Sequence, residues 1–333
     1  MYGYTVRFNR SLTSLLYATD MGWQTDKRLD GKTAVITGAS SGIGKYVALD
    51  LYRRGARVIL PCLSRVEAES AVACIEEEVG GEGVRGGVGE GERGELVIKV
   101  MDLSSLESVR QCAQLLLQEE EAIHFLINNA GVFISDQTLS QDGFQIHFAV
   151  NYLGHFLFTM LLLPLLLKSA PARILNTASD VHYLGKPINA DYIKKVNSSA
   201  LAGYTNSKFA VASFTKELSR KLEGTGVTVY STHPGIVDTP MSEKFLASYN
   251  FFIRTVIKIV AKPVVKTPKE AAETILYCAL DDGVAAESGF YYCDCKRKHA
   301  ASKCEDPKTA KELWDLSINL LDLEHTNLLA VNT

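Results

Sequence analysis

The sequence predicts an α/β fold built around a parallel sheet. In the first half of the chain, short apolar runs typical of buried strands alternate with helical patterns, which implies right-handed β-α-β units. A glycine-rich turn directly follows the first of these strands. The 333 residues can bury a full core, and a content of 47% hydrophobic and 22% charged residues excludes general disorder.

Strands and helices are expected in a regular order along the chain. The expected strands cover residues 33–37, 57–60, 96–100, 123–128, 173–177, 228–232 and 290–293. The expected helices run from the glycine turn to about residue 54 and over residues 67–79, 106–120, 148–167, 204–222 and 309–321. The helix over 148–167 is free of charged residues, but Asn151, His155 and Pro164 favour a buried internal helix over a membrane span.

No linker in the sequence separates a second domain. Residues 30–333 are therefore predicted to form one domain, preceded by an N-terminal extension at 1–29. A segment at 80–94 has eight glycines in fifteen positions and falls between an expected helix and an expected strand. This composition favours a glycine-rich surface insertion within the domain.

Charge and cysteine content exclude several functions. Lys and Arg total 35 against 38 Asp and Glu, a net charge of −3, which argues against nucleic-acid binding. The seven cysteines are odd in number and lie mostly in apolar stretches, so reduced thiols are expected. Cys293-x-Cys295 with His299 and Cys304 does not follow a standard zinc spacing, and no metal site is predicted.

The glycine turn, Thr37-Gly38-Ala39-Ser40-Ser41-Gly42-Ile43-Gly44, is typical of a phosphate-binding loop. Glycines let the backbone turn tightly and approach a pyrophosphate, which then lies at the positive N-terminus of the next helix. Because a strand precedes this turn and a helix follows it, we expect the turn to bind a dinucleotide cofactor.

A catalytic pattern lies in the helix expected over 204–222. Tyr204 and Lys208 are four residues apart and therefore share one helical face. A nearby cation favours the ionised phenol and lowers its pKa toward the range of acid–base catalysis. Ser179 ends an expected strand, at the edge where parallel α/β sheets place their ligands.

Further polar motifs stand near other strand ends. Asn128-Asn129-Ala130-Gly131 ends one strand, Asn151 opens the long apolar helix, and Pro234-Gly235 follows another strand. With these motifs in this order, the sequence resembles the short-chain dehydrogenase/reductase family over about residues 29–295. The resemblance implies a single Rossmann domain, with a doubly wound, seven-stranded parallel sheet and flanking helices.

The resemblance also implies a role for each motif. Tyr204 would be the general acid/base, Ser179 would hydrogen-bond the substrate oxygen, and Lys208 would hold the nicotinamide ribose and lower the pKa of Tyr204. Asn151 would support a water relay behind the lysine. The implied cofactor contacts are Gly38, Ser40, Ser41, Gly42, Ile43, Gly44, Asp102, Leu103, Asn129, Ala130, Gly131, Tyr204, Lys208, Pro234, Gly235, Val237 and Thr239.

Within the family, the resemblance is strongest to the microsomal retinol dehydrogenases that reduce retinal, usually with NADPH. It is carried by Arg28-Leu29-Asp30-Gly31-Lys32, by the 25-residue separation of Ser179 and Tyr204, and by Glu312-Leu313-Trp314-Asp315. It implies hydride transfer between the cofactor and a small hydrophobic alcohol/aldehyde pair such as retinol and retinal. Two alternatives stay open: a reductase of steroids or other lipid carbonyls, and a non-catalytic cofactor-binding regulator.

NADP(H) is the expected cofactor, and NAD(H) is the alternative. The resembling group usually carries an arginine for the 2′-phosphate after the second strand, where this chain has Leu63. Arg65 or Lys45 could take its place. No acidic residue stands at Cys62 to favour the ribose hydroxyls of NAD.

Membrane contact, location and assembly are left open by the sequence. Residues 251–265 place Arg254, Lys258 and Lys262 on one helical face, which fits either a peripheral membrane helix or a surface helix packed on its own domain. The resemblance implies association with the endoplasmic reticulum membrane, but residues 1–30 contain no hydrophobic anchor. Cytoplasmic and mitochondrial locations are the alternatives, and a homodimer is equally open.

Overall fold

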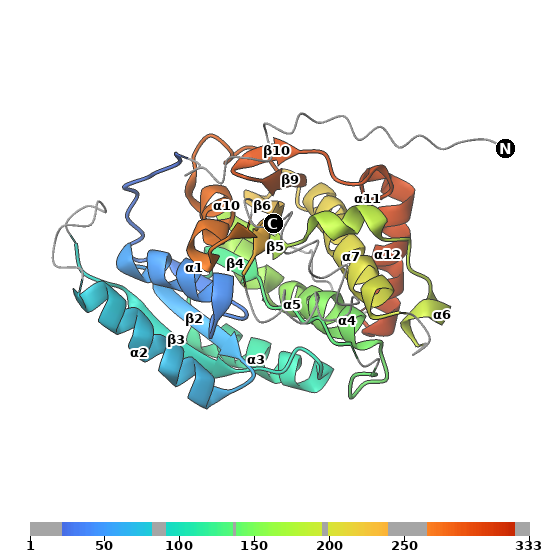
Figure 1. The fold of residues 1–333 in the computed structure, drawn as a ribbon, viewed down its shortest axis with the longest axis horizontal. Coiled ribbons are helices and arrows are strands. Elements are labelled where there is room, and N and C mark those ends of the chain that lie inside the picture. The colour runs from blue at the N-terminus through green and yellow to red at the C-terminus, as the bar shows by residue number, and fades with distance from the viewer. Residues whose placement is uncertain (1–21, 82–90, 136–137, 195–198, 239–264, 324–333) are drawn as a thin grey trace.

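An eight-stranded sheet forms the centre of the protein, in the order β10-β9-β6-β5-β4-β1-β2-β3 (Figure 1). The structure is a computed structural model and describes residues 22–81, 91–135, 138–194, 199–238 and 265–323. The strands of the sheet are β1 (Thr33–Ile36), β2 (Arg57–Cys62), β3 (Glu95–Val100), β4 (Phe125–Asn128), β5 (Ala172–Thr177), β6 (Val227–His233), β9 (Phe290–Cys293) and β10 (Lys296–Lys298). A separate parallel pair consists of β7 (Ile236–Val237) and β8 (Val265–Lys266).

The seven strands from β3 to β9 are all parallel, which confirms the predicted α/β fold. The eighth strand, β10, pairs antiparallel with β9 at the edge and is absent from the sequence prediction. Its three residues are all cationic, so no hydrophobic pattern marks them as a strand. The turn before it, Asp294-Cys295, has two positive φ angles, as a two-residue hairpin requires.

Helices cover both faces of the sheet, each with its own apolar core (Figure 1). One face carries α1 (Gly42–Arg53), α2 (Arg65–Gly81) and α10 (Pro268–Leu280). The other face carries α3 (Leu106–Glu119), α5 (Gly154–Lys168), α7 (Ala200–Lys221) and α12 (Pro307–Leu320). Shorter segments are α4 (Ile146–Phe148), η2 (Ala149–Leu153), η3 (Asp180–Leu184), α6 (Ala190–Ile193) and α11 (Ser302–Glu305).

The longest apolar helix lies in the interior. Among the described residues, the helical stretch Ile146–Lys168 is long and apolar enough to span a membrane, but 83% of its most apolar window is buried inside the protein. It contributes to the core shared with α3 and α7. The structure therefore places it as a core helix, as the sequence predicts.

Backbone crowding explains the glycines of the turn after β1. A Cβ atom on Gly44 would lie 2.3 Å from the carbonyl oxygen of Gly38, and one on Gly38 would lie 2.8 Å from Cα of Ala130. Gly38 also has a φ of 66°, in the left-handed region. A turn this tight can form at the start of α1 only because both positions lack a side chain.

A buried network joins the ends of β1 and β4 to the long helix. Thr37 Oγ1 accepts hydrogen bonds from the backbone N–H groups of Asn129 and Ala130, each at 3.0 Å. With both lone pairs occupied, the hydroxyl donates its own proton to Nε2 of His155, 2.8 Å away. The ring hydrogen of neutral His155 then stands on Nδ1, which donates to the carbonyl oxygen of Asn151 at 3.4 Å.

Gly44→Ala is expected to destabilise the protein, because the added methyl group collides with the Gly38 carbonyl. We expect the free energy of unfolding, measured in urea, to fall by about 1–3 kcal/mol. Gly80→Ala in α2 is the matched control, since a Cβ there would approach no atom closer than 3.9 Å. Alanine favours a helix, so this control should equal the wild type or gain up to about 1 kcal/mol. Similar losses in both variants would contradict the crowding argument.

His155 is expected to make the protein sensitive to acid. Burial lowers the pKa of His155 to about 3 from an ordinary value of 6.5. Below the ordinary value, the unfolded chain binds a proton that the folded protein does not, so stability falls as the pH falls. Between pH 7 and pH 5 the wild type should lose about 2 kcal/mol more stability than His155→Gln, as measured by urea unfolding.

Replacement of an exposed histidine, His299→Gln, is the control for this experiment. An equal pH dependence in His155→Gln and the wild type would show that His155 binds its proton equally well in the folded and unfolded states, which contradicts the lowered pKa.

Candidate active site

The predicted motifs gather at one edge of the sheet. Because β1, β4, β5 and β6 are parallel, the residues that follow these strands lie at the same edge. The glycine turn follows β1, Asn129-Ala130-Gly131 follow β4, Ser179 follows β5, and Pro234-Gly235 follow β6. The fold therefore brings together groups that are far apart in the sequence.

A ladder of buried amides and hydroxyls holds α7 and α5 against the strands. Asn176 of β5 donates through Nδ2 to Oγ1 of Thr215 on α7 at 3.0 Å. Its Oδ1 accepts a hydrogen bond from Nδ2 of Asn128 on β4 at 2.8 Å, and Asn128 also donates to Thr159 of α5 at 2.9 Å. These hydrogen bonds between buried side chains fix the orientation of the elements that carry them, although Oδ1 of Asn128 has no partner among the described residues.

The hydroxyl groups of Tyr204 and Ser179 meet at this edge. Tyr204 is half-buried on α7 and is hydrogen-bonded to Ser179. Burial raises the pKa of Tyr204 to about 12, and the bond to Ser179 offsets this only in part. Lys208 lies one helical turn further, with Nζ 5.8 Å from the centre of the Tyr204 ring, and burial lowers its pKa to about 8. Both shifts have the same cause, because loss of water disfavours a charged group.

Burial raises the pKa of Tyr204 above its ordinary value, and the lowering that the sequence analysis expects from Lys208 stays a prediction. Lys208 Nζ donates a hydrogen bond to the backbone oxygen of Thr177 at 2.8 Å, and burial dominates the pKa of the phenol. Tyr204 is therefore protonated at neutral pH. In this form it can donate a proton to a carbonyl oxygen that accepts a hydride.

Asn151 lies in η2, a π-helical turn between α4 and α5. Its Nδ2 donates to Oγ of Ser207 at 3.0 Å, and its Oδ1 accepts from the backbone N–H of Val132 at 2.7 Å. Since Ser207 immediately precedes Lys208, these bonds tie the catalytic helix to the loop after β4. Turns of this kind are frequent at functional sites. The water relay that the resemblance implies at Asn151 stays a prediction.

An aromatic wall beside Tyr204 is absent from the sequence prediction. The ring of Phe133 lies edge-on to Tyr204 at 5.6 Å between centres, and the ring of His147 lies 6.3 Å from it. Burial lowers the pKa of His147 to about 4, so the ring is neutral, and its Nε2 accepts from the backbone N–H of Ile134. In the sequence, the one feature that could have indicated this contact is the aromatic residue Phe133, two positions after Asn129-Ala130-Gly131.

The glycine turn fits a dinucleotide pyrophosphate. Gly38 and Gly44 form a cradle that any Cβ atom would fill, which permits close approach to the backbone. Ser41 is exposed at the N-cap of α1, and its side chain makes no capping bond, so it leaves the first-turn N–H groups available to an anion. Ser40 and Ile43 lie half-buried in the same turn.

The remaining predicted cofactor residues follow or lie in other strands. Asp102 and Leu103 follow β3, and Oδ1 of Asp102 accepts hydrogen bonds from the N–H and the hydroxyl of Ser104 at 2.8 and 2.7 Å. Val237 is buried in β7, directly after the Pro234-Gly235 turn. Thr239 lies outside the described residues, as does the predicted basic helix at 251–265 except for its last residue.

Two cations stand near the end of β2, where a 2′-phosphate would bind. Arg65 begins α2, is exposed, and lies 3.9 Å from Glu69. Lys45 of α1 donates through Nζ to Sγ of Cys74 at 3.3 Å. The side chain of Leu63, in the position expected for an arginine, is 70% exposed and carries no charge.

Comparison with known proteins agrees with this geometry. The family model described as short chain dehydrogenase matches residues 32–250. The chain is 40% identical to retinol dehydrogenase 12 of Bos taurus over 300 residues, which cover 90% of this chain and 89% of that protein. It is 43% identical to retinol dehydrogenase 14 of Mus musculus over 290 residues, which cover 87% and 85%.

A solved structure has the same fold. The crystal structure of an uncharacterized protein from Mycobacterium paratuberculosis matches with a TM-score of 0.68 at 26% identity, covering 89% of this chain and 95% of that chain. Sequence, fold and site geometry thus agree. The chain belongs to the short-chain dehydrogenase/reductase family, and it is an oxidoreductase that acts on CH–OH groups with a nicotinamide dinucleotide cofactor.

Proposed function

We propose that this protein transfers hydride between NADP(H) and a hydrophobic alcohol/aldehyde pair, and that the pair is retinol and retinal. The observation that carries this proposal is the placement of the Tyr204 phenol against Ser179, one helical turn from Lys208 and edge-on to the Phe133 ring. The similarity to mammalian proteins named retinol dehydrogenases supports the choice of substrate.

Reduction needs a proton donor at the carbonyl oxygen, because the nicotinamide supplies only hydride. In the proposed mechanism Tyr204 donates that proton, and Ser179 holds the same oxygen by a hydrogen bond. Lys208 lies one turn behind the phenol, and its charge stabilises the phenolate that remains. With the cofactor bound, Lys208 would also hold the nicotinamide ribose, and Asn151 would support a relay that returns a proton to the site.

Exposed apolar side chains around the site favour a hydrophobic substrate. Leu184, five residues after Ser179, is 68% exposed, and Ile236, directly after Gly235, is 50% exposed. Phe133 is itself buried and packs edge-on behind the Tyr204 ring, so it adds apolar surroundings to the phenol and no exposed surface. Apolar side chains exposed near a catalytic group are typical of a ligand-binding surface.

The proposed preference for NADP(H) depends on charge near the end of β2. No carboxylate occupies Cys62 or Leu63, where it would bind the ribose hydroxyls of NAD and repel a 2′-phosphate. Arg65 is exposed and held by one distant acid, so it is available to a phosphate. Lys45, at the start of α1, is the second candidate.

The purified protein is expected to oxidise NADPH with all-trans-retinal, followed at the nicotinamide absorbance, and to use NADH much more slowly. Tyr204→Phe should reduce turnover by roughly 10²–10⁴-fold, because it removes the general acid, while NADPH binding is retained. Tyr277→Phe in α10 is the matched control and should keep wild-type turnover.

Other results would redirect the proposal. Turnover of a steroid or another lipid carbonyl, with none of retinal, would replace the substrate while keeping the mechanism. Cofactor binding without turnover of any carbonyl would favour a non-catalytic regulator. Unchanged turnover in Tyr204→Phe would exclude the mechanism itself.

Arg65→Ala is expected to raise the KM for NADPH by about tenfold, because one charge-assisted phosphate contact is lost. The KM for NADH, which has no 2′-phosphate, should not change and serves as the internal control. Lys45→Ala, assayed in the same way, tests the other cation. If neither variant raised the KM for NADPH while leaving the KM for NADH unchanged, neither residue would bind the phosphate.

A further inference from the structure

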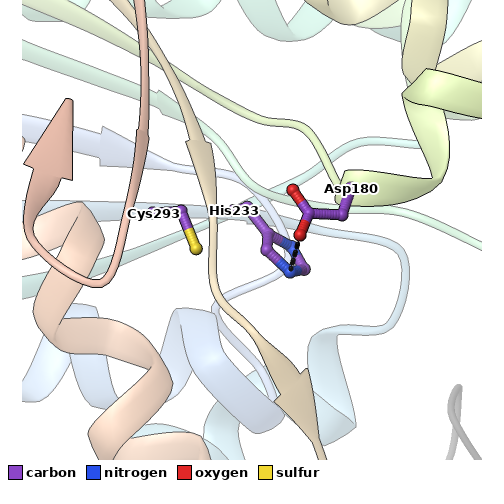
Figure 2. A group of neighbouring side chains, drawn as sticks. All are labelled: Asp180, His233 and Cys293. Carbon is purple, nitrogen blue, oxygen red and sulfur yellow. Dashed lines mark ion pairs between the residues drawn. The ribbon is translucent and has the colours of Figure 1, made fainter. Parts of the chain in front are cut away.

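Three side chains able to bind a metal ion meet beside the candidate active site. The ligand atoms of Asp180, His233 and Cys293 all lie within 4.8 Å of one another (Figure 2). His233 and Cys293 are register partners at the ends of β6 and β9, and Asp180 lies just beyond β5. Since these three strands are parallel neighbours, the cluster is assembled at the carboxyl edge of the sheet.

The imidazole of His233 lacks the hydrogen bonds that a buried ring needs. His233 is 8% exposed, and its Nδ1 is buried with no hydrogen-bond partner among the described residues. Its Nε2 lies 3.6 Å from Oδ2 of Asp180, which is too long for a hydrogen bond. A buried polar ring left in this state is costly, and a metal ion bound at Nε2 would give that nitrogen the partner it lacks, while Nδ1 would keep its ring hydrogen.

The spacing of the three groups suits zinc. In a tetrahedral site with Zn–N and Zn–O bonds near 2.0 Å and a Zn–S bond near 2.3 Å, the ligand atoms lie roughly 3.3–3.6 Å apart. The 3.6 Å between Nε2 of His233 and Oδ2 of Asp180 matches this range. The sulfur of Cys293 lies within 4.8 Å of the other two ligand atoms, so it needs a shift of about 1.5 Å at most to reach the same spacing.

Neighbouring groups orient the ligands and leave a path for the ion. The hydroxyl of Tyr291 donates to Oδ1 of Asp180 at 2.5 Å, so the other carboxylate oxygen is the one that faces His233. Such outer hydrogen bonds are characteristic of metal-binding carboxylates. Asp180 is exposed whereas His233 and Cys293 are buried, so an ion would enter from solvent past the carboxylate.

Positive charge near the cluster is partly offset by one carboxylate. Lys266 and Lys298 lie close to the cluster and both pair with Asp294, at 2.7 and 3.4 Å, so one of their two charges is balanced there. Cys293 Sγ at present donates to Oδ2 of Asp294 at 3.3 Å. On metal binding this thiol proton would leave to solvent, and the thiolate and the Asp180 carboxylate together would balance a charge of 2+.

We propose that Asp180, His233 and Cys293 form a binding site for Zn²⁺, with water as the fourth ligand. Asp180 directly follows Ser179, and His233 directly precedes Pro234. The bound ion therefore ties the turn that carries the substrate-binding serine to the turn after β6. The sequence predicted no metal because it offered Cys293 only the partners Cys295, His299 and Cys304, whereas the sheet pairs it with different ligands.

The test uses the full-length, tag-free protein with reduced thiols and no substrate or cofactor, so it is independent of the proposed activity. Zn²⁺ binding is measured by calorimetry, and Co²⁺ is used as a spectroscopic substitute. The wild type should bind one Zn²⁺, raise its Tm with Zn²⁺, and give a near-ultraviolet thiolate-to-Co²⁺ band. Cys293→Ser should abolish the band and weaken Zn²⁺ binding at least tenfold.

Two further variants make the outcome specific. Cys295→Ser, two residues away and outside the cluster, should keep the band and the wild-type affinity. Asp180→Asn, at an exposed side chain that does not threaten folding, should weaken Zn²⁺ binding at least tenfold. The proposal is overturned if the wild type shows no thiolate band, if the band survives in Cys293→Ser, or if Cys295→Ser removes it.

Discussion

The hydroxyl of Thr37 is the contact on which the active-site edge depends. It receives the backbone N–H groups of Asn129 and Ala130, so it closes the end of β1 against the loop after β4. Thr37 is the first residue of the glycine turn, and the next residue, Gly38, packs against Ala130 with no room for a side chain. One hydroxyl thereby sets the distance between the two loops that would enclose the cofactor.

The same hydroxyl also determines the state of a histidine deep in the protein. Both lone pairs of the Thr37 hydroxyl already accept hydrogen bonds, so the hydroxyl donates its proton to Nε2 of His155. The hydrogen of the neutral ring is then on Nδ1, which donates to the carbonyl oxygen of Asn151. Asn151 in turn holds Ser207, next to Lys208. A continuous path of hydrogen bonds and packed residues therefore connects the phosphate-binding turn with the catalytic helix.

Burial governs the chemistry at the far end of this path. It raises the pKa of Tyr204 and lowers that of Lys208, because both charged forms lose water. The phenol consequently holds its proton until a carbonyl oxygen is beside it. The Asp180, His233 and Cys293 cluster lies next to this site, and there the same loss of water leaves an imidazole that lacks hydrogen bonds.

Much of the fold could be predicted from local patterns. Buried parallel strands are short apolar runs, and the prediction of Phe290–Cys293 as a strand coincides with β9. The π-helical turn at Ala149–Leu153 could not be predicted, because α5 is apolar on nearly every side and one extra residue per turn leaves that pattern unchanged. The start of α7 was placed too late, although Ser199 caps the helix through a hydrogen bond from Ala202.

The sequence by itself determined the α/β class and the alternation of strands and helices along the chain. It also determined the glycine turn and the candidate residues Ser179, Tyr204 and Lys208. These features are local, since each depends on spacing within a few residues. Only the tertiary structure decided the burial that raises the pKa of Tyr204, the tautomer of His155 and the meeting of Asp180, His233 and Cys293. These depend on loss of water and on contacts between strands far apart in the chain, which no sequence spacing encodes.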